Sequence, residues 1–463
     1  MRKSGVAQGR LSFEYEQRDE ADRVTAWSGL PLLVEVMAAF GVPESIRKHL
    51  KVFPDDERQF DEQNIVTSLV LLLAAGGEYL DDLRPFKQDK ALGRLLGFEW
   101  PSPETARLFL YEFHEDRLIE EAIAGIASGR KSCVPKESEG LRGLGLVVQG
   151  LTSQIQRRWP VKDATLDFDS TFQESHKREA KEHYLGGPGY QPMLATWVEQ
   201  GLVVFDEFRD GNVQPHFDAL GVVQKGFAAL PSGIQTRRMR GDSAMYSLPL
   251  LKWLGAKKID FAIGAHMREG LRESCADVPE ENWAHLDTRG DSILHITEVA
   301  YAPKGWKNGD PALRYIGIRM TPIQNELFPE ERSVKYLAVV TNRDTEAAEL
   351  LRWYWAKGGT IEHVHDVLKN DLGSGVFPCG RFGSNAAWLR LSVLTHNLLR
   401  VVRAIGPEDL KDAKPKRLRL YIFAIPALLR SHARRLVACV SSLAERLLAT
   451  RTALWGLPRL PAG

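Results

Sequence analysis

The sequence contains few cysteines, four in 463 residues, and they are widely scattered at Cys133, Cys275, Cys379 and Cys439. No two of them have the spacing of a CxxC pair, so the sequence indicates neither a disulfide framework nor a zinc site. Scattered cysteines of this kind are typical of proteins in a reducing compartment.

Long apolar runs are also missing. The longest, residues 65–75, is too short to cross a bilayer, which requires about 20 residues. The first 17 residues lack the apolar segment of a signal peptide. These absences predict a soluble intracellular protein. With 44% hydrophobic and 26% charged residues, the composition is that of an ordinary globular protein, long enough for more than one domain.

Net charge is nearly absent, at +1, but it is unevenly distributed. Residues 397–463 contain 13 Lys and Arg against 4 Asp and Glu, a net charge of +9, so the remaining chain carries −8. A basic end on a near-neutral protein suggests an anionic partner. The alternative reading of the charge alone is a solvated, Arg-rich helical face.

Apolar periodicity predicts helices over residues 27–125, where prolines at 43 and 103 suit helix starts and Ser102 is a candidate N-cap. Residues 132–144, rich in Gly, Pro and charge, look like a linker. From residue 161 the pattern changes to strands alternating with helices. The expected strands are 164–168, 194–198, 202–208, 236–240 and 259–263, with helices at 213–230 and before Trp253. This order predicts a mixed α/β sheet.

Residues 265–345 break that alternation, with strand-like runs at 293–301, 314–320 and 334–340 separated by Gly, Pro and Asn. We interpret them as a β-rich insertion. Helical patterns return at 345–356, 360–368 and 386–404, and residues 417–448 are expected to form one or two basic helices.

Three carboxylates stand in contexts that suit catalysis. Asp169 ends the alternating run 164–171, Asp242 follows a basic stretch, and Glu362 precedes Lys369 by two helical turns. Three such carboxylates can hold two Mg²⁺ ions roughly 3.5–4 Å apart, which clamp the attacking and leaving oxygens of a phosphodiester. The trio therefore suggests cutting and joining of DNA. Taken singly, each acid has a structural explanation, such as the helix N-cap that Asp242 could form.

The order of motifs resembles the DDE-type transposases of bacterial insertion sequences, in particular the group with a β-rich insertion before the catalytic glutamate. The matching segments, ordered as in that family, are L-D-F-D-S-T at 166–171, G-Y-Q-P at 189–192, R-G-D-S-A-M-Y at 240–246, T-N-R at 341–343, G-T-I-E at 359–362, L-K-N-D-L-G at 368–373, S-N-A-A-W-L at 384–389 and H-N-L-L at 396–399.

The resemblance implies an RNase H-like catalytic core whose first acid comes from the central strand, the second from the end of a later strand, and the glutamate from a helix after the insertion. It assigns Asp169, Asp242 and Glu362 as catalytic residues and metal ligands, with Asp169 shared between two ions. Mg²⁺ is the expected cofactor, with Mn²⁺ as an alternative. The expected partners are terminal inverted repeats and target DNA, bound by a homodimer in the cytoplasm, at the nucleoid.

Two positions depart from the family pattern. Its Tyr/Arg/Glu/Lys signature is matched by Glu362 and Lys369, but its tyrosine and arginine positions fall on Trp355 and Gly358. Tyr354 and Lys357 each lie one residue earlier, so the basic contact before the glutamate is either shifted to Lys357 or replaced. Strand alternation also places Asp167 on the same face as Asp169, where it could orient the first acid.

Seven residues are candidates for DNA contacts. Trp306, on a turn flanked by lysines, could stack on an unpaired base at a cleaved end or simply pack against the protein. The others are cationic: Lys357, Lys369, Arg417, Arg419, Arg434 and Arg435. His363 and His365 are two residues apart on a helix and are expected to point apart, which argues against a zinc site.

These patterns predict six regions. They are a helical DNA-binding or dimerisation region (1–130), a linker and connecting helix (131–160), the first part of the RNase H-like core (161–264), a β-rich insertion (265–345), the second part of the core (346–405) and a basic helical C-terminal region (406–463). Two other functions fit the same residues: an RNase H-like nuclease that does not join DNA, and a domesticated DNA-binding protein.

Overall fold

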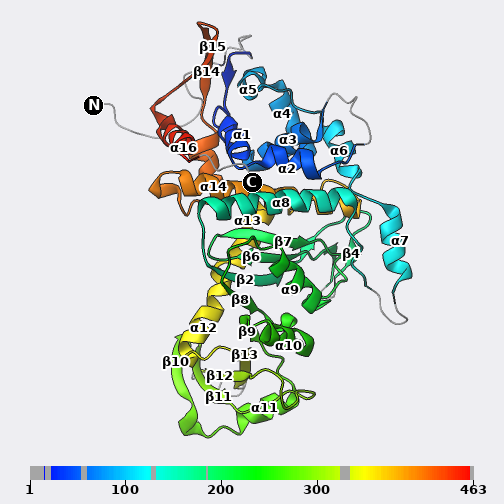
Figure 1. Cartoon of the computed structure of the whole chain (residues 1–463), viewed down its shortest axis with the longest axis vertical. Helices are drawn as coiled ribbons and strands as arrows, with labels where there is room; N and C mark the ends of the chain where they lie inside the picture. The colour runs from blue at the N-terminus through cyan, green and yellow to red at the C-terminus, as the bar shows by residue number, and fades with distance from the viewer. Residues whose placement is uncertain are drawn as a thin grey trace.

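The computed structural model describes residues 15, 22–53, 60–126, 132–183, 186–323 and 334–458, so the first residues of the predicted N-terminal region lie outside the described part. The molecule is elongated (Figure 1). The N-terminal helices and the C-terminal segment lie together at one end, the central strands lie in the middle, and the predicted insertion forms the other end.

The predicted helical character of residues 27–125 is confirmed. The helices are α1 (Leu30–Ala39), α2 (Val42–His49), α3 (Glu62–Ala75), α4 (Leu83–Gln88), α5 (Lys90–Leu96), α6 (Pro103–Tyr111) and α7 (Asp116–Ala124). Local sequence sets their starts: Ser102 accepts a hydrogen bond from the Thr105 amide at the start of α6, as predicted, and Asp61 does the same for Asn64 in α3. The buried α3 forms the centre of this bundle, with every residue from Ile65 to Ala74 buried.

The predicted linker 132–144 is wrong over its second half, because helix α8 (Glu139–Arg158) begins within it. Ser138 caps the helix by accepting from the Leu141 amide. The glycines that suggested a linker instead permit close packing. A Cβ on Gly143 would lie 2.2 Å from the carbonyl oxygen of His49, at the end of α2. The glycine composition thus reflects a helix crossing rather than a flexible segment.

One nine-stranded sheet, in the order β10-β11-β12-β13-β9-β8-β2-β6-β7, runs through the middle and far end of the molecule. Its core strands are β2 (Asp163–Ser170), β6 (Met193–Trp197), β7 (Leu202–Glu207), β8 (Thr236–Gly241) and β9 (Asp260–Gly264). Strands β2, β6 and β7 are antiparallel neighbours, whereas β8 and β9 run parallel to β2. This is the strand arrangement of an RNase H-like core, and it confirms the predicted strands and the β6–β7 hairpin with Gly201 in its turn.

Small strands and helices complete this region. Strands β3 (Gln173–Glu174), β4 (Lys181–Glu182) and β5 (Pro188–Tyr190) form a separate three-stranded sheet, and helices α9 (Ala219–Ala228) and α10 (Leu248–Ala256) flank the core strands. The predicted helix 213–230 was too long at its start. Pro215 lies in a series of turns, and α9 begins only after Asp218, which caps it.

The insertion continues the core sheet rather than forming a body of its own. Its strands are β10 (Ala284–Arg289), β11 (Ser292–Val299), β12 (Arg314–Pro322) and β13 (Lys335–Thr341), with helix α11 (Glu269–Ala276) before them. Strand β13 pairs antiparallel with β9 at three positions, which joins the insertion to the core. The outermost strand, β10, is mostly exposed and has an irregular register between His285 and Asp287.

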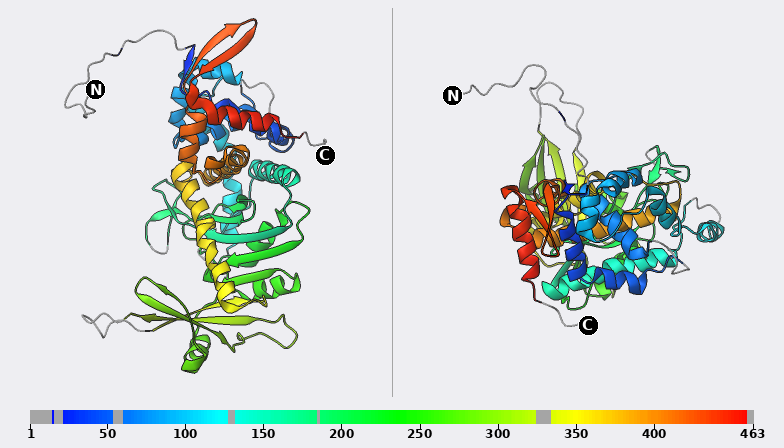
Figure 2. Two further views of the ribbon diagram at one scale, coloured as in Figure 1. Left: turned by 90° about the vertical axis from the view of Figure 1, so that its left-hand side faces the viewer. Right: turned by 90° about the horizontal axis from the view of Figure 1, so that it is seen from above.

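Three consecutive helices follow the insertion: α12 (Ala347–Trp355), α13 (Ile361–Asp371) and α14 (Phe382–Ile405). Figure 2 shows α12 and α13 running one after the other along the sheet. Helix α12 packs on the insertion strands in a second apolar core, where Leu350 and Leu351 meet Ile316 and Ile318. The connection between α12 and α13 therefore lies over the junction of core and insertion.

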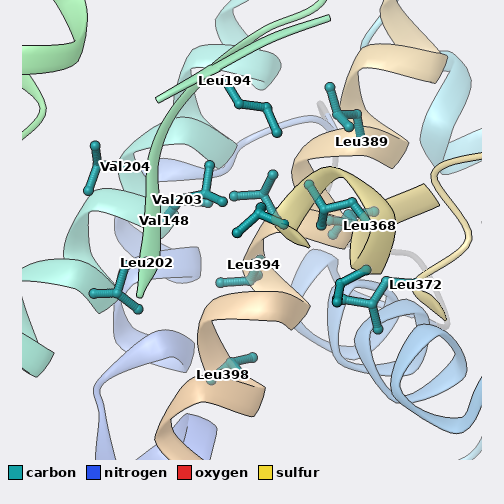
Figure 3. Close-up of a cluster of buried hydrophobic side chains, with 14 of the residues drawn as sticks. Val148, Leu194, Leu202, Val203, Val204, Leu368, Leu372, Leu389, Leu394 and Leu398 are labelled. Carbon is teal, nitrogen blue, oxygen red and sulfur yellow. The ribbon is translucent and has the colours of Figure 1, made fainter. Parts of the chain in front are cut away.

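Helix α14 is almost completely buried and joins the central strands of the sheet to the N-terminal bundle. In Figure 3, leucines of α13 and α14 meet valines and leucines of β6, β7 and α8. Among the buried polar residues of α14, Asn397 is hydrogen-bonded through both polar atoms of its amide group. That side chain accepts from the Val203 amide at 3.0 Å and donates to the Val203 carbonyl at 2.8 Å, on the edge strand β7.

The prediction that residues 417–448 are helical is wrong for their central part. Short helices, α15 (Pro415–Leu418) and a π-turn at Arg419–Phe423, lead to a hairpin of β14 (Ala427–His432) and β15 (Arg435–Val440), followed by α16 (Glu445–Trp455). The hairpin turn uses Ala433 and Arg434, both with positive φ. Such turns normally carry Asn or Gly, so the sequence had no visible turn signal. Strand β14 also pairs with β1 (Val24–Thr25).

Gly143→Ala should destabilise the protein by at least about 1–3 kcal/mol, because the new methyl group collides with the backbone of α2. The matched control is Gly93→Ala in α5, whose Cβ would meet its nearest neighbour at an ordinary 3.6 Å. That change should be neutral or stabilising by about 0.5–1 kcal/mol. Thermal unfolding of both variants tests the helix crossing, and equal melting temperatures would contradict it.

Candidate active site

The register of two parallel strands brings the first two predicted acids together. Phe168 of β2 is paired with Gly241 of β8, so the next residues lie at the carboxyl ends of adjacent parallel strands. Asp169 is still paired with Leu194 of β6, and Asp242 directly follows β8. Phe168 itself points to the opposite face, where its ring meets Phe227 of α9. The acids therefore face the side of the sheet covered by α12 and α13.

Asp242 is held by the turn that follows β8. Its carboxylate accepts from the Ala244 amide at 3.0 Å, which confirms the N-cap geometry expected from the sequence. Burial raises the pKa of Asp242, the positive charge of Lys357 opposes the rise, and the negative charge of Asp169 adds to it. The two aspartates are thus close enough for the charge of Asp169 to act on Asp242.

Lys357 supplies the positive charge between these carboxylates. Its ammonium group lies 3.2 Å from Asp169 Oδ2, and its side chain is only 10% exposed. It sits in a short 3-10 turn, Ala356–Gly359, between α12 and α13. A buried lysine in this place compensates charges that would otherwise repel each other.

Tyr354, on the last turn of α12, lies at this site together with Lys357. Burial raises its pKa to about 12, and the negative charges of Asp242 and Asp169 add to the shift. Its approach depends on Gly264 at the end of β9, because a Cβ there would lie 3.0 Å from Tyr354 Oη and 3.0 Å from the Ser243 amide nitrogen. Tyr354 and Lys357, rather than Trp355 and Gly358, are therefore the residues near the two acids.

Asp167 lies directly behind this site in a buried network. Arg240 of β8 donates two hydrogen bonds to its carboxylate, at 2.6 and 2.7 Å, and both side chains are almost inaccessible. Thr360 also donates to Asp167, and Arg240 donates to the carbonyl of Trp353 in α12 at 2.6 Å. Asp167 is thus fully engaged within the protein, and it ties the acid-bearing strands to the α12–α13 connection.

Glu362 is positioned differently from the two aspartates. It lies in the first turn of α13 and is exposed, with its carboxylate packed beside Gly358, where a Cβ would be 3.6 Å from Oε1. Within the described part of the chain, no three His, Cys, Asp or Glu side chains are gathered closely enough to hold a metal ion. The structure brings Asp169 and Asp242 together, and Glu362 stands one helix turn away from the Lys357 turn.

The donor chemistry at the site fits a divalent cation. Asp169 and Asp242 are hard oxygen ligands of the kind that Mg²⁺ prefers, and their mutual repulsion is balanced here by the ammonium group of Lys357. Glu362 offers a third carboxylate from α13. These three residues could hold a metal ion if the α13 turn brings Glu362 toward the aspartates.

The histidines of α13 separate as predicted. His365 is buried beside the Asp169 backbone, and burial followed by the charge of Lys357 lowers its pKa to about 4. His363 instead lines a cavity on the side of α13 that faces α14. His365 is therefore neutral and supports the end of β2 by packing under it.

A sequence model of the family described as transposase DDE domain group 1 matches residues 16–460. The chain belongs to this DDE transposase family. Among solved structures, the transposase is similar to a chain of the piggyBac transposase synaptic complex with hairpin DNA, at 11% identity and a TM-score of 0.45, covering 91% of this chain and 77% of that chain. No curated protein matches the present chain.

The remaining DNA-binding candidates of the transposase lie in different settings. Lys369 is exposed near the end of α13, and Trp306 is half-buried, with its indole nitrogen donating to the Pro311 carbonyl at 3.2 Å. Trp306 also stacks with Lys252. The structure therefore gives Trp306 a packing contact, and its stacking on a DNA base stays a prediction.

The arginines of the C-terminal region divide into two groups. Arg419 donates to the carbonyls of Ala74, Leu73 and Asp371, so it closes the carboxyl ends of α3 and α13 inside the protein. Arg434 and Arg435 are exposed at the hairpin tip, and Arg417 is half-exposed beside Asp409. Arg419 therefore has a structural position, whereas the hairpin arginines are accessible.

Sequence reasoning missed Arg240 and Thr360 as partners of Asp167. Arg240 lies at the start of the R-G-D-S segment, where its basic neighbours Arg237 and Arg238 did not distinguish it from the rest of a basic stretch. The available signal was alternation: Arg240 is paired with Asp167 in the β2–β8 register, which strand periodicity alone could have suggested once the strands were known to be adjacent.

No helix among the described residues is long and apolar enough to span a membrane.

Asp167→Ala should cost about 3–5 kcal/mol of stability, because it leaves Arg240 buried without its counter-ion. Asp163→Ala on the same strand is the matched control. Asp163 is 47% exposed and lies 3.5 Å from Arg238, so its loss should cost less than about 1 kcal/mol. Chemical denaturation of both variants gives the two free energies, and a small effect of Asp167→Ala would show that the network is not structural.

Proposed function

We propose that this family member is an active DNA transposase that binds the terminal inverted repeats of its element, cleaves phosphodiester bonds at the ends and joins the freed 3′-OH to target DNA. The observation that carries the proposal is the closeness of Asp169 and Asp242 at the carboxyl ends of adjacent parallel strands, next to the buried Lys357. Neither a simple structural cap nor a solvated surface requires two carboxylates and an ammonium group in this arrangement.

Asp169, Asp242 and Glu362 would hold the divalent metal, for which Mg²⁺ is the expected ion and Mn²⁺ the alternative. When bound, such ions stabilise the developing charge on the phosphate and activate the attacking oxygen. The protein supplies the geometry: the β2–β8 register fixes the two aspartates, and the Asp167–Arg240 pair keeps that register rigid.

Lys357 and Tyr354 take the positions of the family's basic and aromatic residues in this proposal. Lys357 contacts Asp169 in the free protein, so its ammonium group balances the carboxylates until metal or DNA phosphate takes over that charge interaction. Lys369, two helical turns after Glu362 on α13, would bind a phosphate as a point charge.

The exposed hairpin suits contact with the DNA backbone. No Asp or Glu occurs between Asp412 and Glu445, while that stretch holds seven Lys and Arg. On one face of the β14–β15 ribbon, Arg430 and the His432–Arg435 pair lie exposed together. Because both transposon ends must be processed together, we expect a homodimer to form the synaptic complex.

Asp169→Ala, Asp242→Ala and Glu362→Ala should each abolish cleavage of a labelled terminal-repeat duplex in Mg²⁺ while leaving duplex binding nearly unchanged, because these residues hold metal rather than DNA. Glu273→Ala, an exposed carboxylate on α11, is the matched control and should cleave normally. Robust cleavage by the Glu362 variant would remove that residue from the site.

Supplying a pre-cleaved end with a free 3′-OH and a plasmid target separates this proposal from a nuclease that cuts without joining. Joined product from the wild type supports the transposase, and cleavage without any joining favours the nuclease.

Binding of the terminal duplex should weaken steeply with salt, with a slope of about −0.9 in log K against log salt for each neutralised phosphate. Changing Arg417, Arg434 and Arg435 to Glu should make that slope shallower. A control that reverses Arg268, Arg272 and Lys304, exposed residues of the insertion at the opposite end of the molecule, should retain the wild-type slope. An unchanged slope in the hairpin variant would show that its arginines do not touch DNA.

A further inference from the structure

A cavity of about 530 Å³ lies between the start of α13, the end of α14 and the β6–β7 turn. We call it the α13–α14 cavity. Its charged lining residues are Arg400, Arg403 and Lys411, which are basic, and Glu408 and Asp412, which are acidic. Gly359, Thr360, His363 and His396 also line it. Its outer rim includes exposed residues of the segment after α14, so the cavity is open to solvent.

Two arginines in this cavity have no acidic partner. No ion pair of Arg400 or Arg403 occurs among the described residues. Arg400 uses its Nε–H for the Gln200 carbonyl at 2.9 Å, whereas the buried Nε of Arg403 has no hydrogen-bond partner at all. Asp412 lines the same cavity, and its charge acts on both arginines, but it forms no ion pair with either of them. A buried cation without a partner is costly, so this arrangement favours an incoming anion.

The electrostatic environment agrees with that geometry. Burial, together with the charge of the neighbouring Arg400, lowers the pKa of Arg403 to about 10, and the side chain stays charged at neutral pH. Burial and then Arg403 lower the pKa of His396 to about 3, so this histidine is neutral. Lys411 and Glu408 on the cavity wall form an ion pair with each other, so the two arginines face the single remaining carboxylate of Asp412 and the cavity keeps a net positive charge.

The first turn of α13 completes the site. Gly359 and Thr360 precede the helix, and His363 lies in its first turn, all on the cavity wall. The first amide groups of a helix have no acceptor within the helix, and the helix dipole makes this end partially positive. Arginines converging on such an end form a binding site for a phosphate or a similar oxyanion.

We propose that the α13–α14 cavity binds a backbone phosphate of the transposon DNA through Arg400, Arg403 and the first turn of α13. The inference rests on the proposed function, since it takes DNA as the source of the phosphate. Thr360 contacts the cavity and also binds Asp167, and the same helix carries Glu362. A phosphate held here would fix the position of α13 relative to β2, and hence the distance of Glu362 from Asp169.

The first experiment uses inorganic phosphate alone, titrated against chloride at constant ionic strength, with thermal unfolding as the readout. The wild type should gain about 1–3 °C at saturating phosphate, and Arg403→Met should lose the gain while melting at the same temperature as the wild type or higher. Arg403→Lys should keep part of the gain. The matched control, Arg272→Met on the exposed surface of α11, should keep all of it.

A structural role for Arg403 predicts the opposite pattern: Arg403→Met would melt lower and respond to phosphate as the wild type does. That result, or a wild type that does not respond, would overturn the proposal. Asp169→Asn should respond normally, because the phosphate titration needs neither metal nor cleavage. If the wild type responds to phosphate but never cleaves DNA, the proposed function is wrong, whereas the anion site is still supported.

The second experiment identifies the source of the phosphate. With the terminal-repeat duplex, Arg403→Met should weaken binding about tenfold at low salt and make the salt slope shallower by about 0.9, the contribution of one phosphate. Loss of the phosphate response with an unchanged slope and affinity for DNA would mean that the cavity accepts a free phosphate compound, and the assignment to DNA would be wrong.

Discussion

The buried pair of Asp167 and Arg240 is the interaction on which the catalytic region depends. The guanidinium group of Arg240, on β8, donates two hydrogen bonds to the Asp167 carboxylate of the central strand β2. It also donates to the carbonyl of Trp353 near the end of α12. Through Thr360 the same carboxylate reaches the start of α13. Every element that carries a candidate catalytic residue thus contacts this ion pair or its direct partners. The positions of the candidate catalytic residues at the surface therefore depend on a charge interaction in the interior.

That pair also explains why the site has two aspartates in one strand. Asp169 stands at the end of β2, half-buried and beside Lys357, where it can exchange partners. Asp167 is two residues back, sealed from water and saturated with donors. The first environment suits a ligand and the second a support. Burial and hydrogen bonding, rather than residue type, therefore separate the two roles.

Much of the core could be predicted from sequence because its signals are local. Alternation marked β2, and Gly201 marked the β6–β7 turn. The rest depended on tertiary contacts. The hairpin β14–β15 was missed because its turn uses Ala433 and Arg434 in a conformation that usually selects Gly or Asn. The start of α8 was missed because Gly143 serves a close helix crossing. The resemblance to DDE-type transposases assigned the three acids, but only the structure showed Glu362 apart from the aspartates.

The two edge strands of the nine-stranded sheet, β7 and β10, are protected from pairing with other molecules in different ways. On β7, Asn397 occupies both polar groups of Val203, so a second strand could not dock there without displacing a buried amide. On β10 the backbone is open, and the edge is interrupted by the irregular register at His285 and Asp287 and by charged side chains such as Arg289. Interruptions and charges of this kind discourage edge-to-edge pairing between molecules. The insertion thereby lengthens the sheet without making the transposase prone to stack into aggregates.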